Sequence, residues 1–219
     1  MIFKQKFVAH LLGCLKDSEY LLFEHFAIHK SIPEIPFNIL LRKKDHQNVI
    51  EEIKSFSEIR VANSSQQEYS CTKLQIEFKD GTEVQLNLWE TLSQSNITFM
   101  NSDMIFAKRQ RSKSEFYMPN IEHLFEFAVL YHFMSNRGLP IQYLNYFEDF
   151  HFFVKDGLLE FFNHKYNTFF LNLDELSNFE LKKKEAIMDR LKKSPNNQFF
   201  KKVNMQWRNL WGNRGVVKS

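Results

Sequence analysis

Apolar residues recur at helical spacing at the start of the chain and throughout its second half. Within residues 3–16 they stand three or four positions apart, which predicts an amphipathic helix that packs on a sheet. A wide apolar stripe over 121–133 predicts a second helix, with Pro119 and Asn120 as start signals and Gly138 as a stop signal. Similar spacing continues from 141 to 191, so the C-terminal half is expected to be helical.

The N-terminal half contains shorter apolar runs, which predict strands. Residues 20–26 and 37–42 are such runs, and the prolines between them separate the two. Asp45 then has the position and chemistry of an N-cap for a helix through Phe56. The first half therefore combines helices with buried strands.

A β-hairpin is the clearest local pattern of the sequence. Apolar and polar residues alternate over 74–78 and 83–89, and Asp80-Gly81 between them favours a type I′ turn. Alternation places Leu74 and its apolar companions on one face. It places Gln85, Asn87 and Trp89 together on the other face.

These patterns predict an α+β fold with a small mixed sheet followed by a helical domain. The expected divisions are an α/β unit over 1–92, a connecting loop over 93–118, and a helical domain over 119–219 that ends in a basic segment. The connecting loop is polar and carries the basic cluster 108–113, which is typical of a solvated loop.

Composition excludes several classes of protein. The 219 residues include 24 Phe, only 6 Gly and 5 Pro, and no GxGxxG or GxxxxGK[ST] phosphate loop. The two cysteines do not form a zinc or disulfide pattern, so a reducing, cytoplasmic location is expected. There is no run of about 18 uncharged apolar residues, and hence no expected transmembrane segment. Cys14 has no evident basic partner that would mark it as a nucleophile.

Positive charge is concentrated at the C-terminal end. Residues 181–219 hold eleven Lys and Arg but only two acidic residues. Aromatic and basic side chains alternate there: Lys201, Lys202, Trp207, Arg208 and Trp211. Such a segment could bind RNA or another polyanion, lie on a membrane surface, or dock on this protein or on a partner protein.

The order of these elements resembles the nucleotidyltransferase superfamily with the DNA-polymerase-β-type palm. The matching segments are YLLFEHF, PFNILLR followed by a basic residue and a helix, the hairpin ending EVQLNLW, and the helix NIEHLFEFAVLYHF. The pattern is similar to uncharacterised bacterial nucleotidyltransferase-family proteins, whose palm precedes a helical domain. The resemblance spans about two thirds of the chain and implies that 1–92 is the palm.

At the family's catalytic positions this chain departs from the pattern. Pro36 and Asn38 occupy the two aspartate positions of the resemblance, and Gln85 or Asn87 replaces the third carboxylate, depending on the register. His132 falls on the histidine of the family's helix motif. Members of the family need two or three carboxylates around two divalent cations. The resemblance therefore implies a protein without the ordinary metal site.

Other carboxylates offer an alternative. Glu24-His25-Phe26 stands where the family has a glycine-containing turn. Glu77, Glu83 and Glu90 lie on or beside the hairpin and could regroup around Mg²⁺ if the chain is an active nucleotidyltransferase. Otherwise no metal and no cofactor is expected, although His25 and His29 are spaced as a metal pair.

Three hypotheses about function follow. The first is a non-catalytic binding or regulatory pseudoenzyme whose cleft holds a nucleotide or a sugar-like ligand through Asn38, Arg42, Lys43, Asn87 and His132. In that case the amides hydrogen-bond the ligand, whereas the alternative is that they only satisfy buried backbone groups. The second hypothesis is an active nucleotidyltransferase with rearranged carboxylates. The third is a basic module that binds RNA or protein through its C-terminal segment. The oligomeric state stays open.

Overall fold

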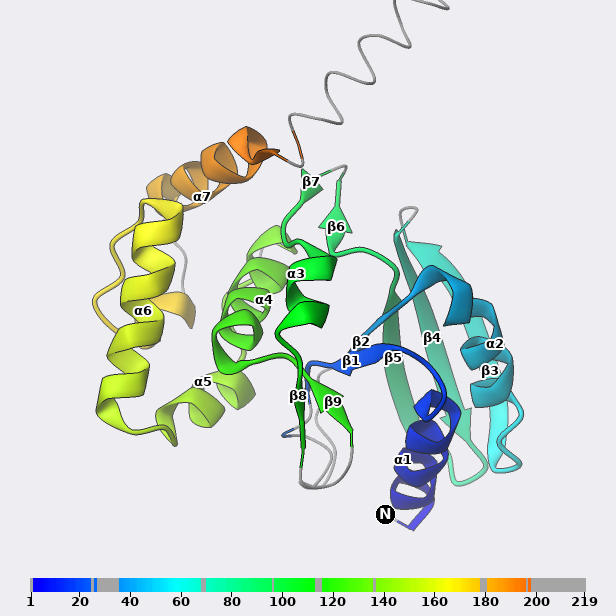
Figure 1. The fold of residues 1–219 in the computed structure, drawn as a ribbon. Helices are drawn as coiled ribbons and strands as arrows, with labels where there is room; N and C mark the ends of the chain where they lie inside the picture. Colours follow the sequence, from blue (N-terminus) through cyan, green and yellow to red (C-terminus); the bar gives the residue numbers. More distant parts are fainter. Residues whose placement is uncertain are drawn as a thin grey trace, which may run out of the picture.

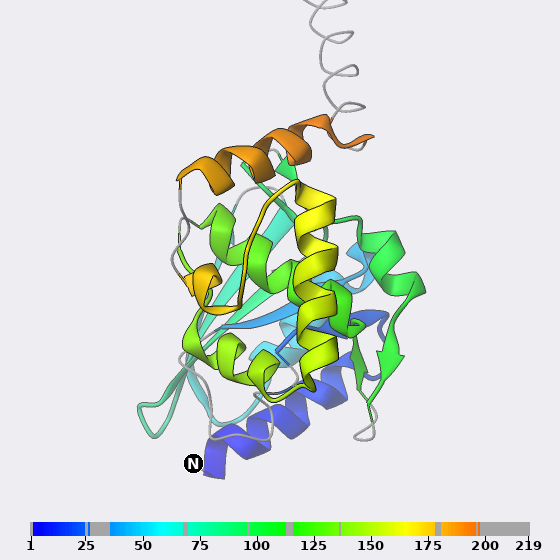
Figure 2. The ribbon, with the colours of Figure 1, turned by 90° about the vertical axis from the view of Figure 1, so that its left-hand side faces the viewer.

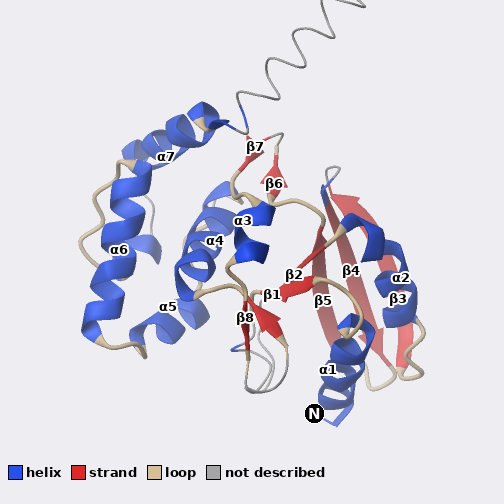
Figure 3. Ribbon diagram, viewed as in Figure 1, coloured by secondary structure: helices blue, strands red, loops and turns tan. Residues whose placement is uncertain are grey.

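A computed structural model describes residues 2–24, 26, 36–67, 70–95, 97–112, 116–135, 137–177, 181–195 and 197. It is an α+β structure in which a sheet precedes a group of helices (Figures 1 and 3). The elements are α1 (Ile2–Leu15), β1 (Tyr20–Leu22), β2 (Phe37–Leu41), α2 (Lys43–Lys54), β3 (Ile59–Gln67), β4 (Cys71–Phe78), β5 (Glu83–Trp89), β6 (Ser93–Gln94), β7 (Ile97–Thr98), α3 (Ser102–Ala107), β8 (Gln110–Arg111), β9 (Tyr117–Met118), α4 (Ile121–Met134), α5 (Ile141–Glu148), α6 (Phe152–Tyr166), the short 3-10 helix η3 (Asp174–Ser177) and α7 (Leu181–Lys193).

The main sheet is mixed and has the strand order β1-β2-β5-β4-β3. β2 and β5 run parallel, and every other neighbouring pair in this sheet is antiparallel. A parallel pair needs a long crossover. Here the crossover passes through α2, β3 and β4. The prediction of an α+β fold with a mixed sheet is confirmed.

The sheet separates two hydrophobic cores. On one face, the apolar residues of the β4–β5 hairpin meet Phe7 and Leu11 of α1 and Val49 of α2. On the other face, Trp89 joins the core of the helical part. Figure 1 shows α1 and α2 beside one side of the sheet, with α3 and α4 on the other. Because alternate residues of a strand point to opposite faces, both cores draw on the same strands.

α4 is the central helix of the second core. Its residues are buried almost all round, as expected for a helix with other elements on every side. Asn120 caps it, accepting a hydrogen bond from the backbone N–H of His123 at 3.0 Å. Figure 2 shows α5, α6 and α7 layered over α4 on the side away from the sheet.

Two local predictions about caps and turns are wrong. Asp45 is not the N-cap of α2, because the helix begins at Lys43, and Arg42 is the N-cap residue. Asp45 instead accepts a bond from the backbone N–H of Glu19 at 3.3 Å. The hairpin turn is not type I′, since Gly81 has a positive φ of 77° but Asp80 does not. The Asp80 carboxylate accepts two bonds from Thr82, so the turn is held by an aspartate side chain.

Two further segments differ from the sequence pattern. Residues 93–118 contain the β6–β7 hairpin, α3 and the β8–β9 pair, where an irregular loop was expected. Gly138 does not end α4, which stops at Met134. The glycine is needed for close packing, because a Cβ there would lie 1.7 Å from the backbone oxygen of Ser177. Among the described residues, no helix has the length and apolar character to cross a membrane.

Candidate functional site

Asn38 and Asn87 lie side by side at the centre of the sheet. The parallel register of β2 and β5 pairs them directly, so Asn87, not Gln85, is the partner of Asn38. Each is 1% exposed, and the Asn87 amide donates to Asn38 Oδ1 at 2.9 Å. Asn87 also accepts from the Gln85 amide at 3.0 Å. The two carboxamides therefore hydrogen-bond each other beneath the surface.

Glu24 is a fully buried carboxyl group beside these amides. It follows β1 and accepts bonds from the Asn38 backbone N–H at 2.5 Å and from the Asn38 amide at 2.7 Å. The Tyr143 hydroxyl of α5 donates to it as well. Burial raises the pKa of Glu24 to about 7, although these donors act in the opposite direction. The carboxyl group therefore links the sheet to the helical part.

Two aromatic residues complete the arrangement. The Trp89 indole N–H donates to Asn38 Oδ1 at 2.9 Å, and the Asn87 amide donates to the Tyr131 hydroxyl at 3.0 Å. We call these six side chains the polar network: Glu24, Asn38, Asn87, Trp89, Tyr131 and Tyr143. Since buried polar groups are costly unless paired, such a network fixes the position of its members.

A cleft of about 670 Å³ adjoins the polar network. Trp89 and Tyr131 belong to both, whereas Asn38 and Asn87 are covered and do not line the cleft. The lining residues come from the start of β2, from β4, β5 and β6, and from the stretch that runs from the end of α4 into α5: Pro36, Cys71, Lys73, Gln85, Trp89, Ser93, Gln94, Tyr131, His132, Ser135, Arg137, Gly138, Pro140 and Gln142. Lys73 and Arg137 are charged, and no carboxylate is among these residues. The cleft is polar and positively charged.

His132 borders this cleft. It is 6% exposed and its ring contacts Tyr131 and Tyr143 edge-on. Its Nε2 is buried without a hydrogen-bond partner among the described residues. Burial and the nearby Arg137 lower the pKa of His132 to about 4, so the ring is neutral at pH 7.

The polar network does not fit a divalent cation, in line with the chain's departure from the family's catalytic pattern. A magnesium site needs free carboxylate oxygens. Here Asn38 Oδ1 already accepts two N–H donors, and both oxygens of Glu24 accept bonds. These donors would face a bound cation with their hydrogens. The described part of the chain also gathers no three His, Cys, Asp or Glu side chains in a metal-binding arrangement.

The three glutamates proposed as substitutes do not come together. Glu77 pairs with Arg60, and Glu83 accepts from the Gln75 amide at 3.1 Å. Glu90 lies 4.0 Å from His46 of α2, beyond the end of β5. Glu77 and Glu83 are paired directly across β4 and β5 beside the hairpin turn, whereas Glu90 lies past the opposite end of β5, so the three do not assemble a common site.

Arg42 and Lys43 also lie away from the cleft. Arg42 forms ion pairs with Glu19 at 3.0 Å and with Asp103 at 2.5 Å, and its guanidinium lies over the Phe106 ring. Its side chain therefore links the sheet to α3. Lys43 is an exposed residue at the start of α2. Neither residue lines the cleft that contains His132.

The remaining candidates from the sequence are Cys14, the histidine pair and the basic C-terminal set. Cys14 has a basic neighbour after all, since His10 Nε2 lies 3.4 Å from its sulfur one helical turn away. Burial raises the pKa of this thiol to about 11, which opposes a nucleophilic role. His25 and His29 lie outside the described residues. So does the whole basic C-terminal set: Lys201, Lys202, Trp207, Arg208 and Trp211.

Sequence reasoning singled out neither Glu24 nor the two cations of the cleft as ligand-binding groups. A signal for Glu24 existed, because it is the only acidic residue in the apolar run over 20–26. A carboxyl group in such a run is buried and needs partners. Nothing in the local sequence marks Lys73 and Arg137 as residues of a common cleft, since the two lie far apart in the chain.

Comparison with known proteins gives distant similarities. No family model matches the sequence, and no curated protein matches it significantly. The structure is similar to the crystal structure of JHP933 from Helicobacter pylori, with 10% identity and a TM-score of 0.45 over 95% of this chain and 97% of that one. It is equally similar to an H. pylori protein provisionally named a nucleotidyltransferase, with 10% identity and a TM-score of 0.45 over 92% and 96% of the two chains. Likeness at this level defines neither a function nor a site for this chain.

Proposed function

We propose that this chain is a nucleotidyltransferase-fold protein without the metal-binding carboxylates, and that it binds a phosphate-bearing ligand such as a nucleotide without transferring it. The observation that carries the proposal is the pairing of Asn38 with Asn87. Two carboxamides face each other across parallel strands at the position where the sequence resemblance expects carboxylates. A binding or regulatory role accounts for a retained cleft without a metal site.

The chemistry of the network supports a non-catalytic role. Two-metal transfer requires carboxylates that neutralise two cations and align the attacking oxygen. Asn38 and Asn87 carry no charge, and Glu24 is held by three donors and raised in pKa. Because their hydrogen bonds are made within the protein, these side chains hold Trp89 and Tyr131 of the cleft wall in place from beneath.

The cleft supports a ligand with both charge and polar edges. Lys73 projects from β4, and Arg137 follows α4, so cations reach the cleft from the sheet and from the helical part. Such groups pair with phosphate oxygens. The amides of Gln85, Gln94 and Gln142 offer donors and acceptors for a base or sugar. The cations supply the positive charge that metal ions supply in an active transferase.

A thermal-shift titration of the full-length protein tests the proposal. ATP, GTP, CTP and UTP are added separately, each with EDTA, with Mg²⁺ and with Mn²⁺. A ligand at about 100 times its Kd stabilises the folded state by roughly 2.7 kcal/mol, which raises the Tm visibly. We expect at least one nucleotide to raise the Tm equally with EDTA and with metal.

Paired variants locate the effect. Lys73→Gln and Arg137→Gln are expected to reduce the nucleotide-dependent shift, whereas Lys79→Gln, an exposed lysine in the hairpin turn, leaves it unchanged. A shift that requires metal contradicts the proposal and favours an active nucleotidyltransferase. The absence of a shift with all four nucleotides also contradicts it.

A further inference from the structure

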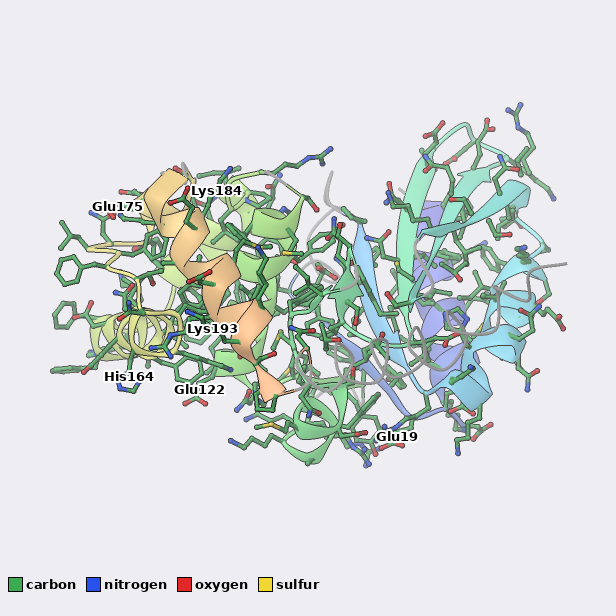
Figure 4. The ribbon with its side chains drawn as sticks, turned by 90° about the horizontal axis from the view of Figure 1, so that it is seen from above. Glu19, Glu122, His164, Glu175, Lys184 and Lys193 are labelled. Carbon is green, nitrogen blue, oxygen red and sulfur yellow. The ribbon has the colours of Figure 1, made fainter. Side chains whose placement is uncertain are left out.

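A second cleft, of about 580 Å³, lies within the helical part, among α3, α4, α6, α7 and the segment after β7. Its lining shares no residue with the first cleft: Thr98, Phe99, Met100, Asn101, Met104, Ile105, His123, Glu126, Lys165, Tyr166, Arg190, Leu191, Lys193, Ser194 and Pro195. Figure 4 shows α7 crossing this part of the molecule, with Lys193 near its end. A cavity of this size accommodates a small organic molecule.

The inner wall contains a buried carboxylate that pairs with an exposed lysine. Glu126 of α4 is 1% exposed and pairs with Lys165 of α6 at 2.5 Å. The Tyr166 hydroxyl also donates to Glu126. Burial and the Glu126 charge raise the pKa of Tyr166 well above its usual range, so the hydroxyl keeps its proton. Lys165 compensates the negative charge of Glu126.

His123 adds an unpartnered polar group to the same wall. It lies one helical turn before Glu126, is 7% exposed, and its Nδ1 is buried without a hydrogen-bond partner among the described residues. A buried ring nitrogen in this condition costs free energy comparable to a lost hydrogen bond.

The rim of the cleft is positively charged. Arg190 and Lys193 project from the last turn of α7. Lys193 pairs with Asp189 at 3.1 Å in an exposed contact, whereas Arg190 has no ion pair within the described part of the chain. Arg190 therefore offers a free guanidinium, a group whose forked N–H donors match a carboxylate or a phosphate.

The remaining lining is largely apolar. Phe99, Ile105 and Leu191 are buried in the wall, and Met104 is 53% exposed beside them. Methionine side chains adapt readily to apolar ligands. This cleft thus differs from the first one, in which amides and hydroxyl groups dominate.

We infer that this second cleft binds an amphiphilic anion, a small molecule with an acidic head group and an apolar body. The head group contacts Arg190 and Lys193, and the body lies against Phe99, Met104 and Leu191. Charge decides between occupants: the excess of cations at the rim repels a basic peptide or amine and attracts an acid. This site is independent of the proposed nucleotide cleft.

Calorimetric titration of the full-length protein with octanoate tests the inference. Octylamine, with the same chain length and the opposite charge, is the ligand control. Arg190→Gln removes the free guanidinium, and Lys192→Gln removes an exposed neighbouring charge that does not line the cleft. We expect saturable binding of octanoate, weakened about tenfold by Arg190→Gln and unchanged by Lys192→Gln. Circular dichroism establishes that both variants are folded.

Arg137→Gln separates this inference from the proposed function. It alters the first cleft and is expected to leave octanoate binding unchanged. The inference is overturned if octanoate does not bind saturably, if octylamine binds as well as octanoate, or if Arg190→Gln binds octanoate as tightly as the unmodified protein. An effect of Arg137→Gln equal to that of Arg190→Gln also overturns it, because octanoate would then occupy the first cleft.

Discussion

The buried Glu24 carboxyl group should make stability depend on pH in an unusual direction. Its pKa is raised from 4.5 to about 7 in the folded protein, so between these values the folded state binds more protons at this site than the unfolded state does. The stabilisation is complete below pH 4.5 and is lost as the pH rises to 7. At about 1.4 kcal/mol per pKa unit, the loss is roughly 3 kcal/mol.

Glu24→Gln isolates this contribution. Glutamine does not titrate, so the free energy of unfolding of the variant relative to the unmodified protein should rise by roughly 3 kcal/mol between pH 4.5 and pH 8. A constant offset is expected in addition, since an amide N–H would face one of the donors from Asn38 or Tyr143. The comparison is necessary because His132 acts in the opposite direction. Because the pKa of His132 is lowered, its contribution to the free energy of unfolding increases as the pH rises from about 4 to 6.5, both in the variant and in the unmodified protein.

Urea unfolding followed by circular dichroism measures the effect at a series of pH values. Glu122→Gln, which changes an exposed glutamate on α4, is the control and should give a difference of free energies that does not vary in this way. Tyr143→Phe removes a donor that lowers the pKa of Glu24, so it should move the pH window upward. If the difference between Glu24→Gln and the unmodified protein is constant to within about 0.5 kcal/mol across the series, the buried carboxyl group does not titrate as described.

Two further predictions concern a glycine and the thiols. Gly138→Ala should lower the free energy of unfolding by about 2 kcal/mol or more, because its Cβ would overlap the backbone of Ser177. Gly157→Ala, in the interior of α6, places a Cβ where no atom lies within 4 Å and should raise the free energy of unfolding by about 0.5–1 kcal/mol. Thermal unfolding of the two variants checks this, and a neutral Gly138→Ala would show that the contact relaxes easily. Burial raises the pKa of Cys14 to about 11 and that of Cys71 to about 12. Both should react with iodoacetamide at pH 8 far more slowly than in urea-unfolded protein, and equal rates measured by mass spectrometry would contradict the burial.

Regular alternation made the hairpin predictable. In β4 and β5 one face is buried against α1 and α2, so apolar residues had to recur at every second position. β3 carries no such pattern. It is an edge strand of the sheet, and Val61, Ser64 and Ser65 on it are exposed, so burial did not select apolar residues there.

The polar network was only partly accessible from sequence. The resemblance identified Asn38 and left Gln85 and Asn87 as alternatives, because a single sequence does not contain the register of β2 against β5. The bond between Glu24 and Tyr143 joins residues 119 positions apart. Local propensity contains no information on contacts of that separation, so Glu24 appeared only as an acidic residue in an apolar run.

The sheet's two cores have a consequence for dissecting the protein. A fragment restricted to residues 1–92 would retain the core beneath α1 and α2 but expose the residues that α4 covers, among them Leu21, Phe23, Leu40 and Trp89. An uncovered apolar face of this kind promotes association of the fragment with itself. The boundary between sheet and helices therefore divides the sequence but does not separate two folding units. Biochemical experiments on one half should keep the other half in the same chain.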